Sequence, residues 1–196
     1  VLEQAKSKGA KGNGFDHLEE KLNHSATRKE HLSKTGDPPE DQLQALTSLY
    51  NERKLQQVFL ETQELVKQYP NSAVLWNLMG ASAGQIGQSD KAVSAFQRLI
   101  SINPNSADAH YNIAITLQGK NNLTEAIEAY KKAIFIKPDY AEAYNDMGIA
   151  LKDQDRLEEA IEAYKKVLAI NSNSAETYTN MGIALREQGK SEKAIQ

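Results

Sequence analysis

The sequence repeats itself every 34 residues, and this period limits the folds that the chain can adopt. The residues Glu-Ala-Ile-Glu-Ala-Tyr-Lys-Lys at 125–132 return unchanged at 159–166. A fixed period of this length is typical of stacked repeats, in which each unit packs on its neighbours and the chain forms a solenoid. The same frame divides the chain into an N-terminal extension, 1–38, and a solenoid, 39–196, with units at 39–72, 73–106, 107–140, 141–174 and 175–196. The first unit is divergent and the last is truncated.

Each unit contains two groups of recurring residues with helical spacing. Positions 4, 7, 8 and 11 carry an aromatic residue or His, an apolar residue, a small residue and a second aliphatic residue, which share one stripe of a helix. From residue 73 onward these are Trp76, Met79, Gly80, Ala83; His110, Ile113, Ala114, Leu117; Tyr144, Met147, Gly148, Leu151; and Tyr178, Met181, Gly182, Leu185. A second group at positions 20, 24 and 27, such as Ala126, Tyr130 and Ala133, predicts a second helix. The small residues allow the two helices to approach closely.

Residues at two further positions predict where these helices end. Position 15 holds residue types that tolerate a left-handed backbone, as a helix needs just past its C-terminus. These residues are Gly87, Asn121, Asp155 and Gly189. The second helices are expected to end before Pro104 and Pro138, because proline cannot continue a helix interior. Ser172 occupies the corresponding place in the next unit and predicts a weaker stop.

This pattern closely resembles the tetratricopeptide repeat family over residues 73–196 and, with several departures, over 39–72. The resemblance implies an all-α, right-handed superhelical solenoid of antiparallel helix pairs. It also implies that residues 39–72 form a capping or divergent unit, since terminal repeats are often atypical. Residues 39–106 are similar to bacterial repeat regions found ahead of sulfotransferase or glycosyltransferase domains.

The resemblance further implies that the first helix of each unit lines a concave groove, through positions 2, 5, 6, 9, 12 and 13. The residues expected to bind a partner there are Asn77, Tyr111, Asn112, Asn145, Asp146, Lys152, Thr179, Asn180 and Arg186. Amide side chains suit an extended peptide, because they both donate and accept hydrogen bonds. The series Asn112, Asp146, Asn180 resembles the asparagine ladder of O-linked N-acetylglucosamine transferase, which grips peptide main chain, although Asp146 and Leu78 depart from it. A clamp for a C-terminal carboxylate is not expected, because the early units lack the cations.

The sequence therefore predicts a protein–protein interaction scaffold that binds a peptide or protein segment in this groove. Two alternatives remain open at this point. In the first, the repeats are the substrate-recruiting arm of a larger transferase. In the second, the solenoid assembles with copies of itself through its ends or its groove. The last unit stops at Gln196, early in its second helix, so the natural protein is expected to continue beyond it.

Composition argues against several other classes of function. The net charge of −3 and the pI near 5.9 give no basic footprint, so nucleic acid is not an expected partner. The chain has no cysteine, which excludes disulfides and thiolate chemistry. No apolar run approaches the roughly 18 residues that span a bilayer, and no signal peptide is recognisable, so membrane insertion is not expected and the cytoplasm is the favoured location.

No catalytic, cofactor or metal site is predicted. His17, His24 and His31 recur every seven residues, but seven helical residues rise about 10.5 Å, too far for two imidazoles to share one zinc ion. His110 is expected to be a packing residue. The carboxylates of the second helices face solvent in i, i+4 pairs, Glu128–Lys132 and Glu162–Lys166.

The N-terminal extension has a simpler pattern. Residues 8–14 are glycine-rich and predict a loop, and residues 16–33 have the spacing of a short amphipathic helix. Docking of this helix on the first unit is the alternative to a loosely packed segment. Asp37 is expected to cap the helix that follows, with Pro38 in its first turn and Glu40 three residues later as a capping box.

Overall fold

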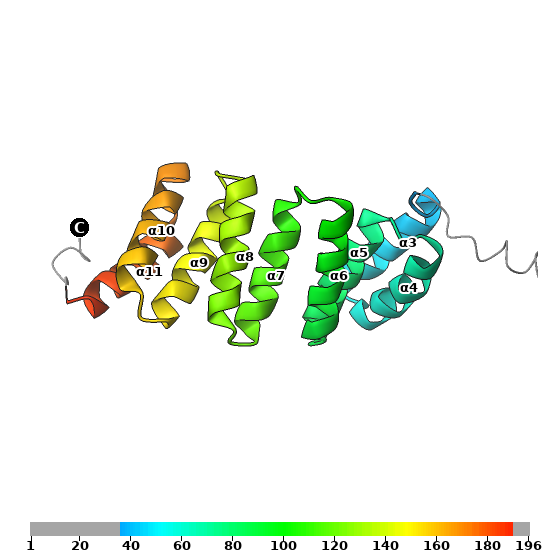
Figure 1. Ribbon diagram of the computed structural model, residues 1–196, viewed down its shortest axis with the longest axis horizontal. Coiled ribbons are helices and arrows are strands. Elements are labelled where there is room, and N and C mark those ends of the chain that lie inside the picture. Colours follow the sequence, from blue (N-terminus) through cyan, green and yellow to red (C-terminus); the bar gives the residue numbers. More distant parts are fainter. Residues whose placement is uncertain (1–35, 190–196) are drawn as a thin grey trace, which may run out of the picture.

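The computed structural model describes residues 36–189, which form α-helices joined by short turns and loops. The expectations for residues 1–35, including the three histidines and the helix at 16–33, lie outside the described residues, as does the segment 190–196. The described helices are α3 (Glu40–Asn51), α4 (Leu55–Gln68), α5 (Ala73–Gln85), α6 (Ser89–Ile102), α7 (Ala107–Gly119), α8 (Leu123–Ile136), α9 (Ala141–Asp153), α10 (Leu157–Ile170) and α11 (Ala175–Glu187). They follow one another along the long axis of the molecule (Figure 1), which confirms the all-α solenoid.

The helices keep the register that the 34-residue period predicts. The odd-numbered helices α5, α7, α9 and α11 are the first helices of their units, and each begins 34 residues after the one before. The even-numbered helices α4, α6, α8 and α10 are the second helices and have the same spacing. The helix α10 ends at Ile170, in register with Ile136 and Ile102, although Ser172 replaces proline there. Proline is therefore not needed for the second helix to stop at this place.

The turn inside each unit has a left-handed residue at position 15, as predicted. The φ angles are 79° at Gly87, 62° at Asn121, 60° at Asp155 and 75° at Gly189. Arg53 occupies the same position in the first unit with φ 61°, which its residue type does not suggest. In four turns the amide of position 16 donates to the carbonyl of position 11, as in Arg156 N to Leu151 O at 2.9 Å. This bond satisfies a helix-end carbonyl and explains why the left-handed residue recurs.

The starts of the first helices are capped mainly by serine. Ser72, Ser106 and Ser174 each accept a hydrogen bond from the backbone three residues later. The prediction for Asp37 is wrong, because α3 follows Pro39 and has no side-chain cap. The Asp37 carboxylate instead accepts a hydrogen bond from Ser72 Oγ at 2.5 Å. It thus ties the segment before α3 to the start of α5.

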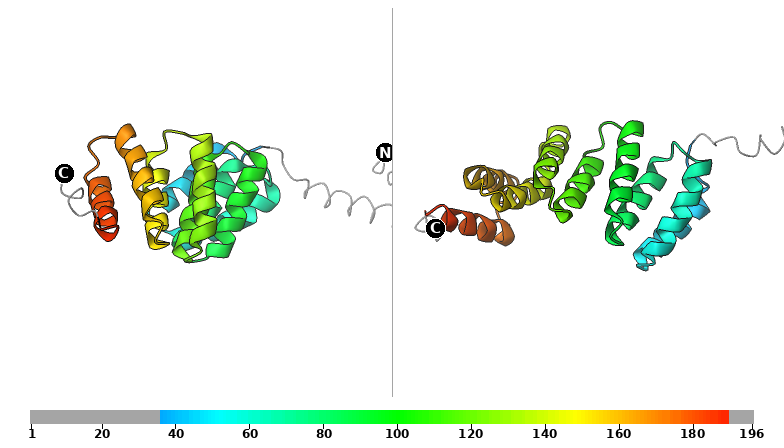
Figure 2. Two further views of the ribbon diagram at one scale, coloured as in Figure 1. Left: turned by 60° about the vertical axis from the view of Figure 1, so that its left-hand side comes forward. Right: turned by 60° about the horizontal axis from the view of Figure 1, so that its bottom comes forward.

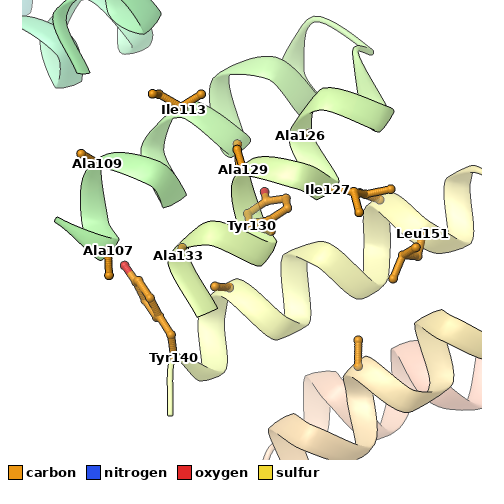
Figure 3. Close-up of a cluster of buried hydrophobic side chains, with 14 of the residues drawn as sticks. Ala107, Ala109, Ile113, Ala126, Ile127, Ala129, Tyr130, Ala133, Tyr140 and Leu151 are labelled. Carbon is orange, nitrogen blue, oxygen red and sulfur yellow. The ribbon is translucent and has the colours of Figure 1, made fainter. Parts of the chain in front are cut away.

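The apolar core runs continuously through the stack. One buried cluster extends from Phe59 of α4 to Leu185 of α11, and a smaller cluster surrounds Leu46 and Leu75 at the N-terminal end. Figure 3 shows Tyr130 of α8 within the large cluster. The small residues at position 8 are required where an aromatic ring lies against them. A Cβ on Gly80 would lie 2.6 Å from Cε1 of Phe96, and one on Gly148 would lie 2.5 Å from Cε1 of Tyr164.

The stack curves so that its first helices lie on the inner side. The helix α5 contacts α7, α7 contacts α9, and α9 contacts α11. Consecutive second helices make no comparable contact, as expected if the stack bends so that the second helices spread apart on its convex side. The views in Figure 2 show the same order of helix pairs from other sides. The concave wall is thus built from first helices, in the place where the sequence analysis put the groove.

The outer face differs in detail from the expectation. Its ion pairs have i, i+3 spacing, with Lys131 Nζ 2.9 Å from Glu128 and Lys165 Nζ 2.6 Å from Glu162. The predicted partners Lys132 and Lys166 are not used in these pairs. His110 is half-buried, and burial together with the charge of Lys132 lowers its pKa. This agrees with a packing role.

Candidate functional site

The concave wall carries a chain of hydrogen bonds that links three successive first helices. Tyr111 of α7 donates to Asp146 Oδ2 of α9 at 2.8 Å. The neighbouring Asn145 donates to Asp146 Oδ1 and to Glu176 of α11, at 3.4 and 3.2 Å. Asn180 of α11 donates to Asn145 Oδ1 at 3.4 Å. We call Tyr111, Asn145, Asp146 and Asn180 the polar ladder, and all four were predicted groove residues.

The ladder exists because residues 35 apart lie side by side on neighbouring first helices of the wall. Position 5 of one unit meets position 6 of the next, as in Tyr111 with Asp146 and Asn145 with Asn180. Each ladder side chain is half-buried, so part of its hydrogen-bonding capacity is used between units and part faces the groove. The amides therefore do not form the row of free groups that the sequence suggested.

Aromatic rings support one end of the ladder. The ring of Tyr111 lies 4.9 Å from that of Tyr140 and 5.9 Å from that of Tyr130, measured between centroids. Tyr140 in turn donates to Asp108 Oδ1 at 2.8 Å, and its ring lies 4.2 Å from Lys137 Nζ. Burial, followed by the hydrogen bond to Asp146, raises the pKa of Tyr111. The phenol therefore stays protonated as a donor at neutral pH.

The carboxylates of this region make its part of the groove acidic. Burial raises the pKa of Asp146, and the hydrogen bonds from Tyr111 and Asn145 act in the opposite direction. The negative charges of Glu176 and Glu142 raise that pKa further. We call Asp108, Glu142, Asp146 and Glu176 the acidic half of the groove.

A hollow lies in the other part of the groove and is lined by residues of α3, α5, α6 and α7. Its volume is about 460 Å³, and its walls include Tyr50, Ala81, Gly84, Asn112, Ile115 and Gly119. Ile115 is 43 % exposed although it is aliphatic. The described residues that line the hollow include no acidic or basic side chain. We call it the neutral hollow.

The other predicted residues have separate positions. Asn112 lines the neutral hollow, and its side chain makes no hydrogen bond within residues 36–189. Lys152 Nζ pairs with Asp153 at 2.8 Å. Thr179 is exposed and bonds back to the carbonyl of Ala175 at 2.9 Å. Asn77 and Arg186 are exposed on the same series of first helices.

The predicted binding residues did not include Tyr140, Asp108, Gly84 or Gly119, although Asp108, Gly84 and Gly119 occupy the nominated positions 2, 12 and 13. Tyr140 stands where three other units have the capping serines Ser72, Ser106 and Ser174, and this departure from the repeat was the available signal. The hollow had no such signal, because it depends on side chains missing from α5 and α7 at the place where these helices meet α3 and α6.

The part of the chain that the structure describes holds no group of three or more His, Cys, Asp or Glu side chains placed to bind a metal ion. Among residues 36–189 there is also no helix both long and apolar enough to cross a membrane.

Comparison with known proteins agrees with the helix pattern. A family described as "TPR repeat" matches residues 119–155 and 150–189, and two described as "Tetratricopeptide repeat" match 95–128 and 78–106. Together these matches span residues 78–189. The chain belongs to the tetratricopeptide repeat proteins. The matches concern the repeats, so the neighbouring transferase domain stays a prediction.

Curated relatives match only over a short segment. The peroxisomal targeting signal receptor of Candida glabrata is 33 % identical over 54 residues, which are 28 % of this chain and 9 % of that protein. The receptor of Saccharomyces cerevisiae is 34 % identical over 47 residues, which are 24 % of this chain and 8 % of that protein. The chain thus spans less than a tenth of the length of these relatives.

Solved structures match over most of the described chain. A crystal structure of MamA aligns with a TM-score of 0.72 at 22 % identity, covering 76 % of this chain and 86 % of that one. MamA from Desulfovibrio magneticus RS-1 has the same TM-score at 18 % identity, covering 78 % and 86 %. YrrB, described as a TPR protein with an unusual peptide-binding site, aligns with a TM-score of 0.65 at 17 % identity, covering 76 % and 77 %. At these identities the likeness concerns the fold.

Proposed function

We propose that this chain is a non-enzymatic scaffold that binds an extended peptide or protein segment along its concave groove. The observation that carries the proposal is the coincidence, on one wall, of the polar ladder and the neutral hollow. Partly exposed amides beside an exposed aliphatic side chain suit a peptide, which offers both main-chain hydrogen bonds and apolar side chains. The peptide-binding site named for YrrB, which shares the fold, is in keeping with this use.

Groove and outer-face variants of the whole chain test the proposal. A random 12-residue peptide library is selected on the wild-type chain, and the captured peptides are then measured against two variants. Asn112→Ala combined with Ile115→Asp alters the groove at two half-buried or exposed side chains without touching the ladder. Lys131→Ala is the matched control, because it removes an exposed side chain of the second-helix face.

The groove variant should lose at least about tenfold in affinity, or roughly 1.4 kcal/mol, while the control keeps wild-type affinity. Circular dichroism of each variant checks that helicity is unchanged. Peptides that bind the groove variant normally but fail on the Lys131 variant would place recognition on the outer face and overturn the proposal.

A further inference from the structure

The two parts of the concave groove differ in chemistry, and this difference bears on what the groove binds. The neutral hollow, lined by residues of α3, α5, α6 and α7, has no charged side chain among its described lining residues. The acidic half begins on α7 with Asp108 and continues through Glu142 and Asp146 to Glu176 of α11. Both belong to the same wall, because α7 contacts α5 on one side and α9 on the other.

The hollow stays open because two helical positions carry no side chain. A Cβ on Gly84 would meet Ala92 Cβ at 3.8 Å and Thr116 Oγ1 at 4.0 Å, and one on Gly119 would meet nothing within 4 Å. Neither glycine has a positive φ, and neither is required by packing, in contrast to Gly80 beside Phe96. Glycine in a helix costs about 0.5–1 kcal/mol relative to alanine. The absent side chains therefore leave space at the expense of helix stability.

The acidic half has unbalanced negative charge. Glu142 and Glu176 both act electrostatically on Asp146, and Asn145 bridges Asp146 to Glu176. The ammonium of Lys137 lies over the Tyr140 ring, and Arg186 is exposed further along α11. Lys152, further along α9, is paired with Asp153. A cationic side chain from a partner would offset the repulsion among these carboxylates and would be favoured over an anionic one.

The separation of the two parts sets the spacing of a ligand that fills both. Packed helices lie about 8–10 Å apart, so the hollow and Asp146 are roughly 10–20 Å apart, one or two helices along the wall. An extended chain advances about 3.3 Å per residue. It covers this distance in about three to six residues.

We propose that the groove selects an extended peptide segment with a bulky aliphatic or aromatic side chain in the neutral hollow and a lysine or arginine about three to six residues away, over the acidic half. This inference rests on the proposed function and specifies the chemistry of its partner.

Synthetic peptides test both contacts. Fluorescein-labelled peptides contain one Leu and one Lys in a Gly/Ser background, with spacings of three to six residues and in both orders. Fluorescence anisotropy with the full chain should show at least one spacing that binds about tenfold more tightly than its Leu→Ser and Lys→Glu counterparts. The advantage of Lys over Glu should shrink with added salt, because exposed charges are screened.

Protein variants separate the two subsites. Gly119→Leu should fill the hollow and weaken the Leu/Lys peptide at least about tenfold, while Gly119→Ala, the matched control, changes affinity by less than about threefold. Asp146→Asn combined with Glu176→Gln should reduce the preference for Lys over Glu, because two of the four carboxylates of the acidic half are neutralised. In Asp146→Asn the remaining side-chain oxygen can still accept from Tyr111, while the 3.4 Å bond from Asn145 loses its acceptor. Thermal denaturation of each variant confirms that it is folded.

Three results would overturn the inference. These are equal binding of the Lys and Glu peptides, unchanged affinity in Gly119→Leu, or no binding of any Leu/Lys peptide. Selection from the random library distinguishes this failure from that of the proposed function. Groove-binding peptides that are acidic or wholly polar would leave the scaffold proposal standing and reject the stated chemistry. An absence of groove-binding peptides would reject both.

Discussion

Replacing Gly148 by alanine tests how closely α9 and α10 must approach. The new Cβ would lie 2.5 Å from Cε1 and 2.9 Å from Cζ of Tyr164. The Tyr164 side chain is fully buried, so its ring or a helix has to move. Overpacking of this kind costs about 1–3 kcal/mol, whereas alanine gains about 1 kcal/mol over glycine in helix propensity. The free energy of unfolding should therefore fall by about 1 kcal/mol.

Gly84→Ala is the matched change without the collision. Its new Cβ would make only ordinary contacts, at 3.8 Å and beyond, so the propensity gain should remain and raise stability by up to about 1 kcal/mol. The two variants each add one methyl group to a first helix, yet they should differ by about 2 kcal/mol. For a chain of this size that corresponds to roughly 4–8 °C in Tm. Thermal and urea denaturation followed by circular dichroism measure the difference.

The third unit shows that the collision can be relieved by adjustment, because Ala114 occupies the position of Gly148 there beside the buried Tyr130. Replacing the ring by a smaller side chain in Tyr164→Leu should accordingly reduce the loss of stability caused by Gly148→Ala, which a double-mutant cycle detects. Equal Tm values for Gly148→Ala and Gly84→Ala, or a zero coupling energy with Tyr164→Leu, would refute the argument from close approach.

Three further predictions concern polar groups. The buried Tyr164 hydroxyl has no hydrogen-bond partner among the described residues, whereas the equivalent Tyr130 donates to Gln118, which occupies the position of Lys152 in the preceding unit. Lys152→Gln should therefore raise the free energy of unfolding by about 1 kcal/mol, measured by urea denaturation. The pKa of His110 is lower in the folded chain than its ordinary value of 6.5, so protonation favours the unfolded chain as the pH falls below 6.5. His110→Tyr removes this group and should therefore reduce the loss of stability between pH 7 and pH 5. The pKa of Asp146 is raised in the folded chain, so its ionised form lowers the free energy of unfolding at pH 7. Asp146→Asn should therefore stabilise the chain at pH 7. The gain should fade below about pH 4, where the carboxyl is protonated in both states. Stability curves against pH, with the wild type as control, check the last two, and parallel curves would contradict them.

Much of the fold was predictable because its determinants recur locally. The period places the starts of α5, α7, α9 and α11, and the residue at position 15 predicts each left-handed turn from Gly87 to Gly189. Local rules failed where a neighbouring unit competes for the same group. Asp37 was expected to cap α3, but its carboxylate bonds Ser72 at the start of α5 instead.

The sequence predicted which helices form the concave wall but not how the side chains on that wall bond to one another. The resemblance nominated the first-helix positions, and the contacts of α5, α7, α9 and α11 place those helices on the inner side. Whether Asn145 and Asn180 would face a ligand or each other depended on the offset between units, which pairs residues 35 apart. No local pattern contains that offset.

The 34-residue recurrence, taken alone, determined the helices, their turns and the small residues beneath the aromatic rings, because each of these depends on contacts within one unit or on backbone conformation. The curvature, the polar ladder from Tyr111 to Asn180, the acidic half and the neutral hollow were decided only in the tertiary structure. The ladder, the acidic half and the hollow each need residues from three different units, and the curvature depends on how successive units pack. Their relative positions follow from how the units stack.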